Sequence, residues 1–538
     1  MRDSPLRAGK TALAAILLLT LGAYWTTLSS SFHFDDYALF ADPHVTAADG
    51  WWRVFRPAQS RPLTYFTFWI NYQLGKESPR GYHAVNLAIH LAAVLAAWSV
   101  FGRLLAPTCQ SWRHTTPSGR GSETLAEPRP KGAVSGGGLH ANFCKFALGL
   151  PAAILATAIF ALHPLQSEAV AYVFARSTLL ATLLCLLSWR AWLDGRPWRA
   201  AAWFALSLLA KEESVAFPLF LLVVDWLRGQ WRRQNAAALT AMLAAATAAG
   251  ARLLYLAARV PGAAAGASAG VDPLTYLLTQ PNVILSYFAM FLVPFGQNLD
   301  HQIEPFEISD ALSVGAMLVL AAIVTIALRQ RRRLLWLVGT LVLLAPTSSF
   351  IPLADFMFEH RMYLPLIGLS AGVAAELRRA PALALAVVVL AMTVATAARA
   401  RVWSSERTLW EDAVEKSPAK VRPKLQLARA VMRSDPHRAQ SLLLEARRLE
   451  PANPETFTQL GTLYLEQKNP AAALAEFDQA LTRQARSPEA HSNRGVALYL
   501  LGRSGDAETA FRRALDIDPA HRNARQNLDL LLRSRQAP

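Results

Sequence analysis

Residues 11–37 are TALAAILLLTLGAYWTTLSSSFHFDDY, an apolar run that ends shortly before two adjacent aspartates. The run from Thr11 to Leu28 is long and apolar enough to cross a bilayer as one helix. Asp35 and Asp36 follow it between aromatic residues, where carboxylates are costly unless they are solvated, paired or used in chemistry. This stretch therefore predicts a membrane-embedded chain with an acidic pair at one membrane surface.

The composition agrees with a multi-pass membrane protein that carries a polar domain. Of the 538 residues, 53% are hydrophobic, and the formal net charge is +16. Much of the basic charge lies in short connections between apolar runs, where it orients membrane spans, so we expect no nucleic-acid partner. The three cysteines, Cys109, Cys144 and Cys185, lack metal-ligand spacing, which argues against a zinc site or a disulfide framework.

Apolar runs recur along the first 400 residues. About twelve candidates lie near residues 11–29, 83–106, 147–162, 177–193, 198–210, 214–227, 236–256, 275–294, 310–328, 334–350, 362–376 and 380–398. Basic clusters alternate between them as cytoplasmic connections do, except around 275–294. That run contains Gln280-Pro281-Asn282, and we interpret it as an interfacial or re-entrant segment.

About eleven spans then remain, which places the N-terminus in the cytoplasm and the C-terminal domain outside. We therefore expect an integral membrane protein, in the inner membrane if the source is bacterial. Residues 1–400 would form its all-α transmembrane domain, with a first outer loop at 30–82. The Gly- and Ser-rich stretch at 108–146 would be a flexible cytoplasmic loop, and residues 401–419 would form a connecting helix.

Residues 420–538 show a repeating pattern with a period of 34 residues. The positions that recur are Ala439, Ala473 and Ala507; Ala446, Ala480 and Ala514; and Leu443, Phe477 and Phe511. Small residues at such spacing let paired helices pack closely, as in tetratricopeptide repeats (TPR). We therefore expect an α-solenoid of about three repeats, closed by a cap helix near residues 522–533, which would bind a protein or peptide.

Charged residues of both signs gather at the span ends that are predicted to lie outside. Any one of them could simply solvate the interface, but a mere anchor does not need the whole set, and ionisable groups near membrane depth are candidates for function. The candidate site residues are Asp35, Asp36, Arg61, His163, Glu168, Arg176, Lys211, Glu212, Glu359 and Arg361.

Such a set suits glycosyl transfer from a lipid-linked donor. A polyprenyl phosphate leaves as an anion that needs nearby cations, such as Arg176, Lys211 and Arg361. The acceptor hydroxyl needs a carboxylate to take its proton, and Asp35 or Asp36 would do so with inversion at the anomeric carbon. Two adjacent carboxylates could also hold Mg²⁺ or Mn²⁺, although we expect no obligatory metal.

Six motifs occur in order along the chain: FDD at 34–36, RPLT at 61–64, YHAVNLAIH at 82–90, HPLQSEAV at 163–170, AKE at 210–212 and EHRMYLP at 359–365. With the repeats that follow, this order resembles the transmembrane and TPR-containing O-mannosyltransferases of the GT-C superfamily. The resemblance implies a GT-C-type helical bundle and a polyprenyl-phosphate sugar donor. It also implies a catalytic acidic residue in the first outer loop, which maps onto Asp35 or Asp36. Lys211 and Arg361 match best the residues that contact the donor phosphate.

The resemblance further implies transfer of a sugar to Ser or Thr of extracytoplasmic proteins, with the acceptor held by the repeats. The chain departs from the eukaryotic members because it has about three repeats rather than a long array. The main alternative is a non-catalytic, membrane-anchored scaffold for protein binding. A transporter is less favoured, since the ionisable residues lie at span ends rather than at mid-span.

Overall fold

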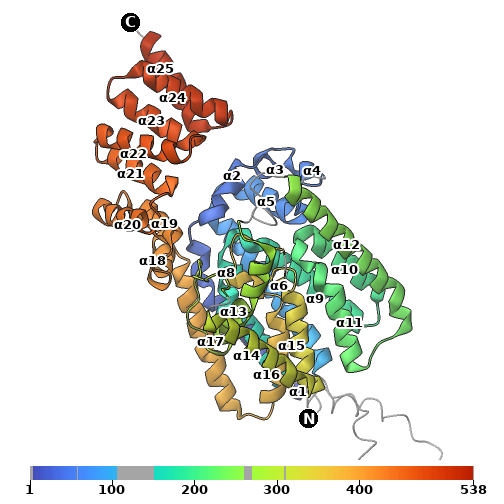
Figure 1. The fold of residues 1–538 in the computed structure, drawn as a ribbon. Coiled ribbons are helices and arrows are strands. Elements are labelled where there is room, and N and C mark those ends of the chain that lie inside the picture. The colour runs from blue at the N-terminus through green and yellow to red at the C-terminus, as the bar shows by residue number, and fades with distance from the viewer. Residues whose placement is uncertain are drawn as a thin grey trace, which may run out of the picture. The chain divides into compact units, whose positions relative to one another are not determined.

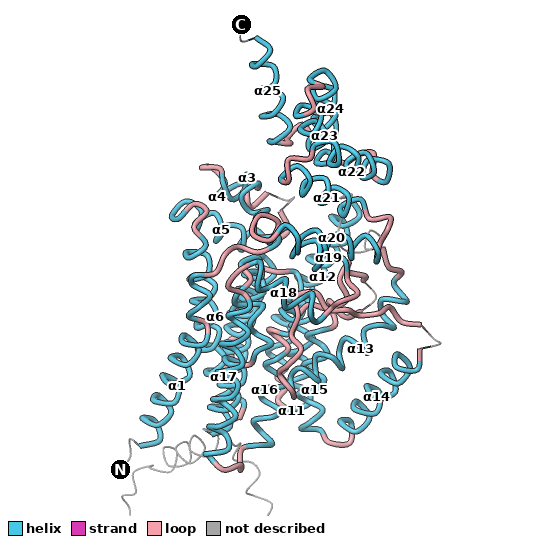
Figure 2. The backbone as a smooth tube through the Cα atoms, turned by 90° about the vertical axis from the view of Figure 1, so that its left-hand side faces the viewer, coloured by secondary structure: helices cyan, strands magenta, loops and turns pink. Residues whose placement is uncertain are grey.

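The computed structural model describes residues 4–56, 59–105, 151–259, 270–307, 310–349 and 351–536. The described part of the chain is built from helices and connecting loops and contains no β-strand (Figures 1 and 2). The all-α prediction is thereby confirmed. The predicted loop at 108–146 lies outside the described residues.

The chain divides into two units. The first, which we call the membrane unit, comprises residues 1–297 and 303–404. The second, the repeat unit, comprises residues 298–302 and 405–538. Because the short segment Asn298–Gln302 belongs to the repeat unit, the chain passes from one unit to the other three times.

Helices of very different length make up the membrane unit. Three short ones lie in the first outer loop: α2 (Ala38–Ala41), α3 (Pro43–Thr46) and α4 (Gly50–Arg53). The others are α1 (Ser4–Ala23), α5 (Pro62–Gly75), α6 (Pro79–Leu104), α8 (Ser167–Ala171), α9 (Arg176–Leu193), α10 (Pro197–Ala210), α11 (Phe217–Arg228), α12 (Ala236–Arg259), α13 (Pro273–Leu292), α14 (Ala311–Leu328), α15 (Arg331–Leu344), α16 (Leu366–Leu377) and α17 (Ala382–Val402).

Four of the described helical stretches are long and apolar enough to cross a membrane: Pro79–Leu104, Val173–Leu193, Arg233–Leu256 and Ala382–Val402. A fifth candidate is the pair Pro151–Leu162 and Pro164–Ala171, which is bent by 47°. The predicted number of eleven spans is therefore not confirmed. Several predicted runs form helices of only 12 or 14 residues, such as α11 and α10, and a helix rises only about 1.5 Å per residue. The 275–294 run lies in the 20-residue helix α13, with Pro281 inside it.

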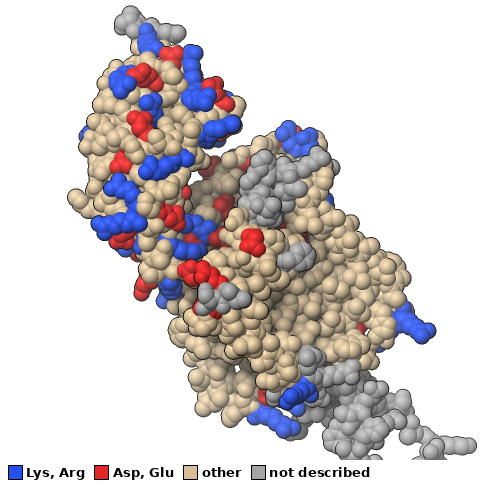
Figure 3. All heavy atoms as spheres, viewed as in Figure 1, with Lys and Arg blue, Asp and Glu red and all other residues tan. Residues whose placement is uncertain are grey.

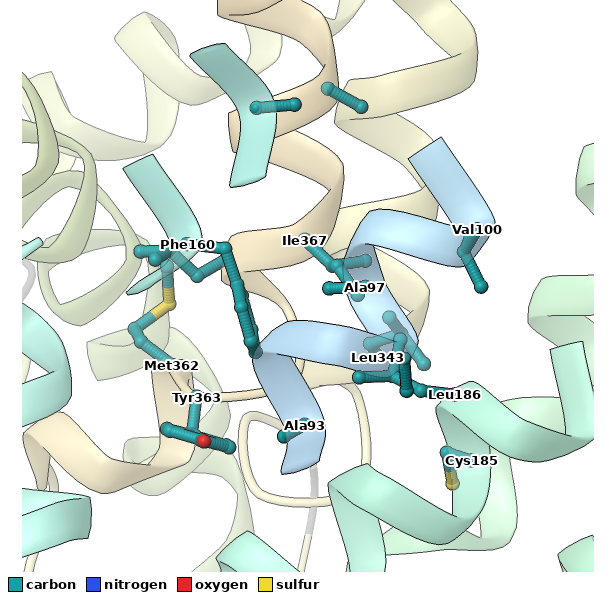
Figure 4. Packing of buried hydrophobic residues seen from close by; sticks show 14 of the residues in the cluster. Ala93, Ala97, Val100, Phe160, Cys185, Leu186, Leu343, Met362, Tyr363 and Ile367 are labelled. Carbon is teal, nitrogen blue, oxygen red and sulfur yellow. The ribbon is translucent and has the colours of Figure 1, made fainter. Parts of the chain in front are cut away.

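Small side chains line the buried part of α6, whose main neighbour is α9. Ala93, Ala97 and Val100 follow one another along α6, and Figure 4 shows Ala97 beside Ile367 of α16. All belong to one buried apolar cluster. Alanine at successive turns permits tight helix contact, which is how helices associate where lipid supplies no hydrophobic drive.

The repeat unit is a row of helix pairs. Its helices are α18 (Glu406–Lys416), α19 (Val421–Val431), α20 (Pro436–Leu449), α21 (Pro454–Glu466), α22 (Pro470–Arg483), α23 (Pro488–Leu500), α24 (Ser504–Ile517) and α25 (Arg522–Gln536). A Cβ added at Gly461 would lie 2.5 Å from the Phe477 ring, and one at Gly495 would lie 2.6 Å from Phe511. The repeating Gly and Phe thus mark the closest approach within each helix pair, and the predicted α-solenoid is confirmed.

The segment Asn298–Gln302 is held firmly within the repeat unit. The buried carboxylate of Asp300 accepts hydrogen bonds from Lys420 Nζ at 2.5 Å and Arg422 Nε at 2.6 Å. Asn298 Nδ2 donates to Ser417 Oγ at 2.8 Å. Burial opposes ionisation, but Arg422 and Lys420 outweigh it and hold the pKa of Asp300 below its usual value.

The two units differ in the charge that they expose. In the face shown in Figure 3, Lys, Arg, Asp and Glu cover much of the repeat unit, whereas most of the visible membrane unit carries none of them. An apolar surface of that kind suits contact with lipid.

Candidate functional site

Asp36 anchors the first outer loop. It is fully buried, and its two carboxylate oxygens accept the backbone N–H of His33 at 3.0 Å and of Phe174 at 2.8 Å. Phe174 lies 138 residues away in sequence, so this side chain ties the loop to the segment before α9. Burial raises the pKa of Asp36 to about 8, although the two backbone donors favour the charged form.

Asp35 differs from its neighbour because its side chain is exposed. The preceding residue, Phe34, has a φ of +46°, a backbone conformation that residues other than glycine seldom adopt. Such strain persists only where surrounding contacts enforce it, and it is common at functional sites. Here the anchored Asp36 and the strained Phe34 together set the position at which Asp35 is presented.

His33 attaches the same loop to the end of α17. Its Nε2 lies 2.7 Å from the carbonyl oxygen of Trp403, and the two rings meet edge to face. Burial lowers the pKa of His33 to about 4, so the imidazole is neutral near pH 7. A neutral, buried histidine is a structural support rather than a source of charge.

Arg61 and Glu212 form a two-pronged ion pair across 151 residues of sequence. Arg61 Nε donates to Glu212 Oε2 at 2.9 Å, and Arg61 Nη2 contacts Oε1. Burial opposes ionisation of Glu212, but Arg61 outweighs it and lowers the pKa to about 2. The pair therefore stays charged and joins the start of α5 to the turn after α10.

Lys211 is a buried cation with two partners. Its Nζ lies 2.8 Å from Glu213 Oε2 and 2.8 Å from Thr178 Oγ1. Burial lowers the pKa of Lys211, while Glu213 acts in the opposite direction. Glu213 in turn has a lowered pKa because Lys211, His360 and Arg361 outweigh its burial. Because His360 and Arg361 affect the pKa of Glu213, the 211–213 and 359–361 turns lie within electrostatic range of each other.

Glu168 and His360 form a close pair. His360 Nδ1 lies 2.6 Å from Glu168 Oε1, and the His360 backbone N–H donates to Oε2 at 3.2 Å. The Glu168 side chain is 1% exposed and that of His360 is 16% exposed, so the imidazole is the accessible partner. Glu359, the residue before it, is fully buried.

Arg361 is held by neutral groups. Its guanidinium donates to the carbonyl oxygens of Phe356 and Asp355, each at 3.0 Å, and lies over the Phe358 ring. Carbonyl groups orient a guanidinium but do not cancel its charge. Arg361 is therefore a preoriented source of positive potential.

Arg176 and His163 use their polar atoms inside the protein. Arg176 is fully buried, donates to Asn86 Oδ1 at 2.8 Å and to the Tyr82 carbonyl at 3.0 Å, and lies over the ring of Phe68. His163 Nδ1 accepts the Leu165 N–H, and Nε2 lies 2.9 Å from the Phe291 carbonyl. Arg176 thus joins the start of α9 to α6, and His163 joins the turn before α8 to the end of α13.

The structure links the remaining candidate residues through groups that are not in the predicted set. Burial raises the pKa of Tyr65, and Arg61, Asp35 and Glu212 all act on it from nearby. Asp35 and the Arg61–Glu212 pair are therefore both within electrostatic range of Tyr65. Lys211 and Glu213 flank Glu212 in sequence, and Glu213 is within electrostatic range of His360 and Arg361. Sequence offered a signal for Tyr65, Glu213 and His360, since each lies in or next to a quoted motif. Thr178 carried no such signal.

The acidic pair is a poor match for a protein-held metal. Both Asp36 oxygens accept backbone N–H groups, so Asp36 is already occupied in holding the loop. Within the described ranges, no three His, Cys, Asp or Glu side chains are grouped so that they could hold a metal ion. That no metal is obligatory stays a prediction.

Comparison with known proteins finds a repeat family and a set of curated relatives. The family model for the tetratricopeptide repeat matches residues 458–522. Protein O-mannosyl-transferase Tmtc3 of Drosophila melanogaster is 30% identical over 37% of this chain and 22% of its own length. Protein O-mannosyl-transferase TMTC4 of Mus musculus is 34% identical over 24% of this chain and 14% of its own. A Caenorhabditis elegans protein O-mannosyl-transferase is 27% identical over 43% and 30%.

This chain is similar to the TMTC O-mannosyl-transferases. The matched segments span less than a third of each of those relatives. Among solved structures, the first TPR domain of human RPAP3 covers 22% of the chain, at 19% identity and a TM-score of 0.22. The candidate spans and the TMTC relatives together indicate a membrane protein with a TPR domain.

Proposed function

We propose that this protein is a membrane glycosyltransferase that moves a sugar, of the mannose class, from a polyprenyl-phosphate donor to Ser or Thr hydroxyls of proteins. The observation that carries the proposal is the difference in burial and bonding between the two aspartates. Asp36 is buried and fixed by two backbone donors, while Asp35 is exposed and presented beside a strained residue. A scaffold has no need to hold a carboxylate in that way.

In the proposed reaction, Asp35 accepts the proton of the acceptor hydroxyl as its oxygen attacks the anomeric carbon. The bond from that carbon to the phosphate oxygen breaks, and the phosphate leaves with the electron pair. Attack opposite the leaving group inverts the anomeric centre. A positioned carboxylate base of this kind typically contributes about 10²–10⁴-fold in rate.

Cations of the 211–213 and 359–361 turns would bind the leaving phosphate. Arg361 is the strongest candidate because its printed hydrogen bonds go to backbone carbonyls, which orient the guanidinium. His360 is held through Nδ1 by the buried Glu168, and as an imidazolium it would donate to the phosphate through Nε2. Lys211 would have to exchange Glu213 for the phosphate. Preoriented cations stabilise the charge that develops on a leaving group.

The repeats would hold the acceptor protein, as helical repeats commonly bind peptides and proteins. In this proposal they lie on the same side of the membrane as Asp35, which is the extracytoplasmic side.

The experiment is a transfer assay with the full chain in liposomes, polyprenyl-phosphate mannose and Ser/Thr-rich peptides. Mass spectrometry of the peptides reads out an added hexose and its position. We expect Asp35→Asn to lower the rate at least about 100-fold without lowering the melting temperature. Asp49→Asn is the matched control, because Asp49 is a part-exposed carboxylate of the same loop that pairs with Arg53.

Full activity of Asp35→Asn would refute the base assignment. Absence of any hexose transfer by the wild-type protein, together with capture of a protein by the repeats, would favour the scaffold. A comparison of extracytoplasmic proteins from cells with and without this gene would identify the natural acceptors as those that lose a hexose.

A further inference from the structure

Large aromatic side chains lie exposed on the first outer loop, and the proposed transfer reaction uses none of them. Trp51, Trp52 and Phe55 belong to α4 and the turn that follows it, and all three are exposed. Val54, which lies between them in sequence, is fully buried. Since Trp51 and Trp52 precede Phe55 by four and three residues, this helical stretch turns one aromatic side outward.

The apolar surface continues from α4 onto α5. The ring centroids of Phe55 and Phe66 lie 6.0 Å apart, and Phe66 stacks on Trp69 at the same separation. Ile70 and Leu74 follow Phe66 at intervals of four residues, so they lie on the same side of α5, and Leu74 is 83% exposed. We call the exposed side chains the loop face: Trp51, Trp52, Phe55, Ile70 and Leu74. Contiguous apolar surfaces of this kind commonly mark contact with a membrane or a protein.

The unpaired charge beside the loop face is positive. The guanidinium of Arg56 lies over the Trp52 ring, 4.5 Å from its centroid, and no carboxylate in the described part of the chain is within ion-pair distance of it. Arg53 is already paired, with its Nε 2.7 Å from Asp49 Oδ2. The helix α5 contains no Asp, Glu, Lys or Arg. An unpaired arginine beside tryptophan complements lipid phosphates that lie above hydrocarbon.

Both ends of this part of the loop lie at the ends of candidate spans. Near the end of α12, Arg252 Nη2 donates to the Gln59 carbonyl oxygen at 2.7 Å, and α12 belongs to the candidate span Arg233–Leu256. At the other end, α5 stops at Gly75 and the candidate span Pro79–Leu104 begins four residues later. The ends of spans lie at the membrane–water boundary, where tryptophan is enriched. The loop face is thereby held at the depth of the lipid headgroups.

We propose that the loop face lies in the interfacial layer of the bilayer, with its apolar side chains among the upper acyl chains and Arg56 at the lipid phosphates. Its partner is thus the lipid surface itself. The proposal does not depend on the transfer reaction, because the loop face shares no residue with the candidate site.

The test is electron paramagnetic resonance of nitroxide labels on the full chain in phospholipid nanodiscs. Ile70→Cys and Leu74→Cys are labelled one at a time in a chain that also carries Cys109→Ser and Cys144→Ser. Cys185 is buried and stays unlabelled. Oxygen concentrates in hydrocarbon and a nickel chelate in water, so the ratio of their collision rates with the label measures how deeply it is immersed.

Two matched positions calibrate the ratio. Val387→Cys reports lipid, because Val387 is exposed in the candidate span Ala382–Val402. Tyr499→Cys reports water, because Tyr499 is exposed on α23 of the repeat unit. We expect the oxygen-to-nickel ratio at Ile70 and Leu74 to be several-fold above that at Tyr499 and close to that at Val387.

Ratios at both loop positions equal to that at Tyr499 would place the loop face in water and overturn the proposal. Low collision rates with both reagents, together with spin–spin broadening, would show that a second copy of the chain covers the face, and would overturn it as well. Arg56→Glu places a carboxylate among the phosphates and should shift the Leu74 ratio towards the Tyr499 value. Arg486→Glu, at an exposed arginine of the repeat unit, is the control and should leave the ratio unchanged. Equal ratios in these two variants, each with a wild-type melting temperature, would contradict the position assigned to Arg56.

Discussion

The two units use charged side chains in opposite ways. In the membrane unit, Glu168, Lys211 and Arg361 are all buried, and each has specific partners. In the repeat unit, most ion pairs lie at the surface. Arg433 and Glu466, for example, meet at 3.4 Å with side chains that are 87% and 45% exposed.

Burial changes how much free energy a charged side chain contributes to stability. A charge taken out of water costs several kcal/mol (about 3–5 when its partner is removed), so it persists only where partners are supplied. An exposed pair contributes about 0–1 kcal/mol. The contrast predicts that charge removal in the membrane unit changes activity or folding, while the same change on the repeat surface does little.

After the loss expected for Asp35→Asn, the largest effect that we expect is on donor use. Arg361→Gln removes a guanidinium that two backbone carbonyls orient, and should raise the KM for the polyprenyl-phosphate donor about 10–100-fold. Kinetics at varied donor concentration measure this, and Arg361→Lys should restore part of the loss. Arg103→Gln, at a part-exposed pair with Asp194, is the control. An unchanged KM in Arg361→Gln would remove Arg361 from the donor site.

Asp36→Asn separates anchoring from catalysis. An amide can accept only one of the two backbone N–H groups through its oxygen, so the variant should lose about 1–3 kcal/mol of stability. Activity should then fall together with the melting temperature, unlike in Asp35→Asn. A stable but inactive Asp36→Asn variant would instead favour Asp36 as the base.

The same variant should change the pH dependence of stability. The pKa of Asp36 rises from 3.8 to about 8 on folding, so between these values the folded state holds a proton that the unfolded state releases. Its contribution to stability is therefore complete below pH 4 and is lost as the pH rises through about 8. Melting temperatures from pH 4 to pH 9 should show this decline in the wild type and a flatter curve in Asp36→Asn.

Side-chain packing, rather than charge, should determine the stability of the repeat unit. Gly461→Ala would drive a methyl group into the Phe477 ring and cost about 1–3 kcal/mol. Hydrogen exchange in α21 and α22 measures the loss locally. Gly505→Ala, where no atom lies within 4 Å of the added Cβ, is the control and should leave exchange unchanged. Equal protection in both variants would contradict the close approach.

The smallest effect should come from the surface pair. Arg433→Ala should change the stability of the repeat unit by less than about 0.5 kcal/mol, again by hydrogen exchange. A loss as large as that of Gly461→Ala would break the contrast between the two units.

Local patterns in the sequence predicted the helical class and the solenoid. The spacing of Ala473, Phe477 and Ala480 reflects packing within one helix pair, and such nearby contacts leave a periodic signal. The number of spans was harder to predict, since hydropathy does not show where an apolar run such as 214–227 breaks. The structure ends α11 at Arg228, followed by Gly229 in a left-handed conformation.

The candidate site shows the same limit. Motif order predicted Asp35, Asp36, Lys211 and Arg361 as a set, but nothing in two adjacent aspartates says which one is buried. That distinction comes from the Phe174 N–H, which a contact over 138 residues supplies. Long-range partners of this kind leave no local periodicity, so they emerge only from the fold.

The attachment of Asn298–Gln302 to the repeat unit also has a consequence for the timing of synthesis. Asp300 is made 120 residues before Lys420 and 122 before Arg422. At roughly 5–20 residues per second, the buried acid waits on the order of 6–24 s for the cations that neutralise it. During that interval α14 to α17 must be made and placed while this segment is still unpaired. The repeat unit therefore finishes folding only by returning to a segment laid down before the last helices of the membrane unit existed.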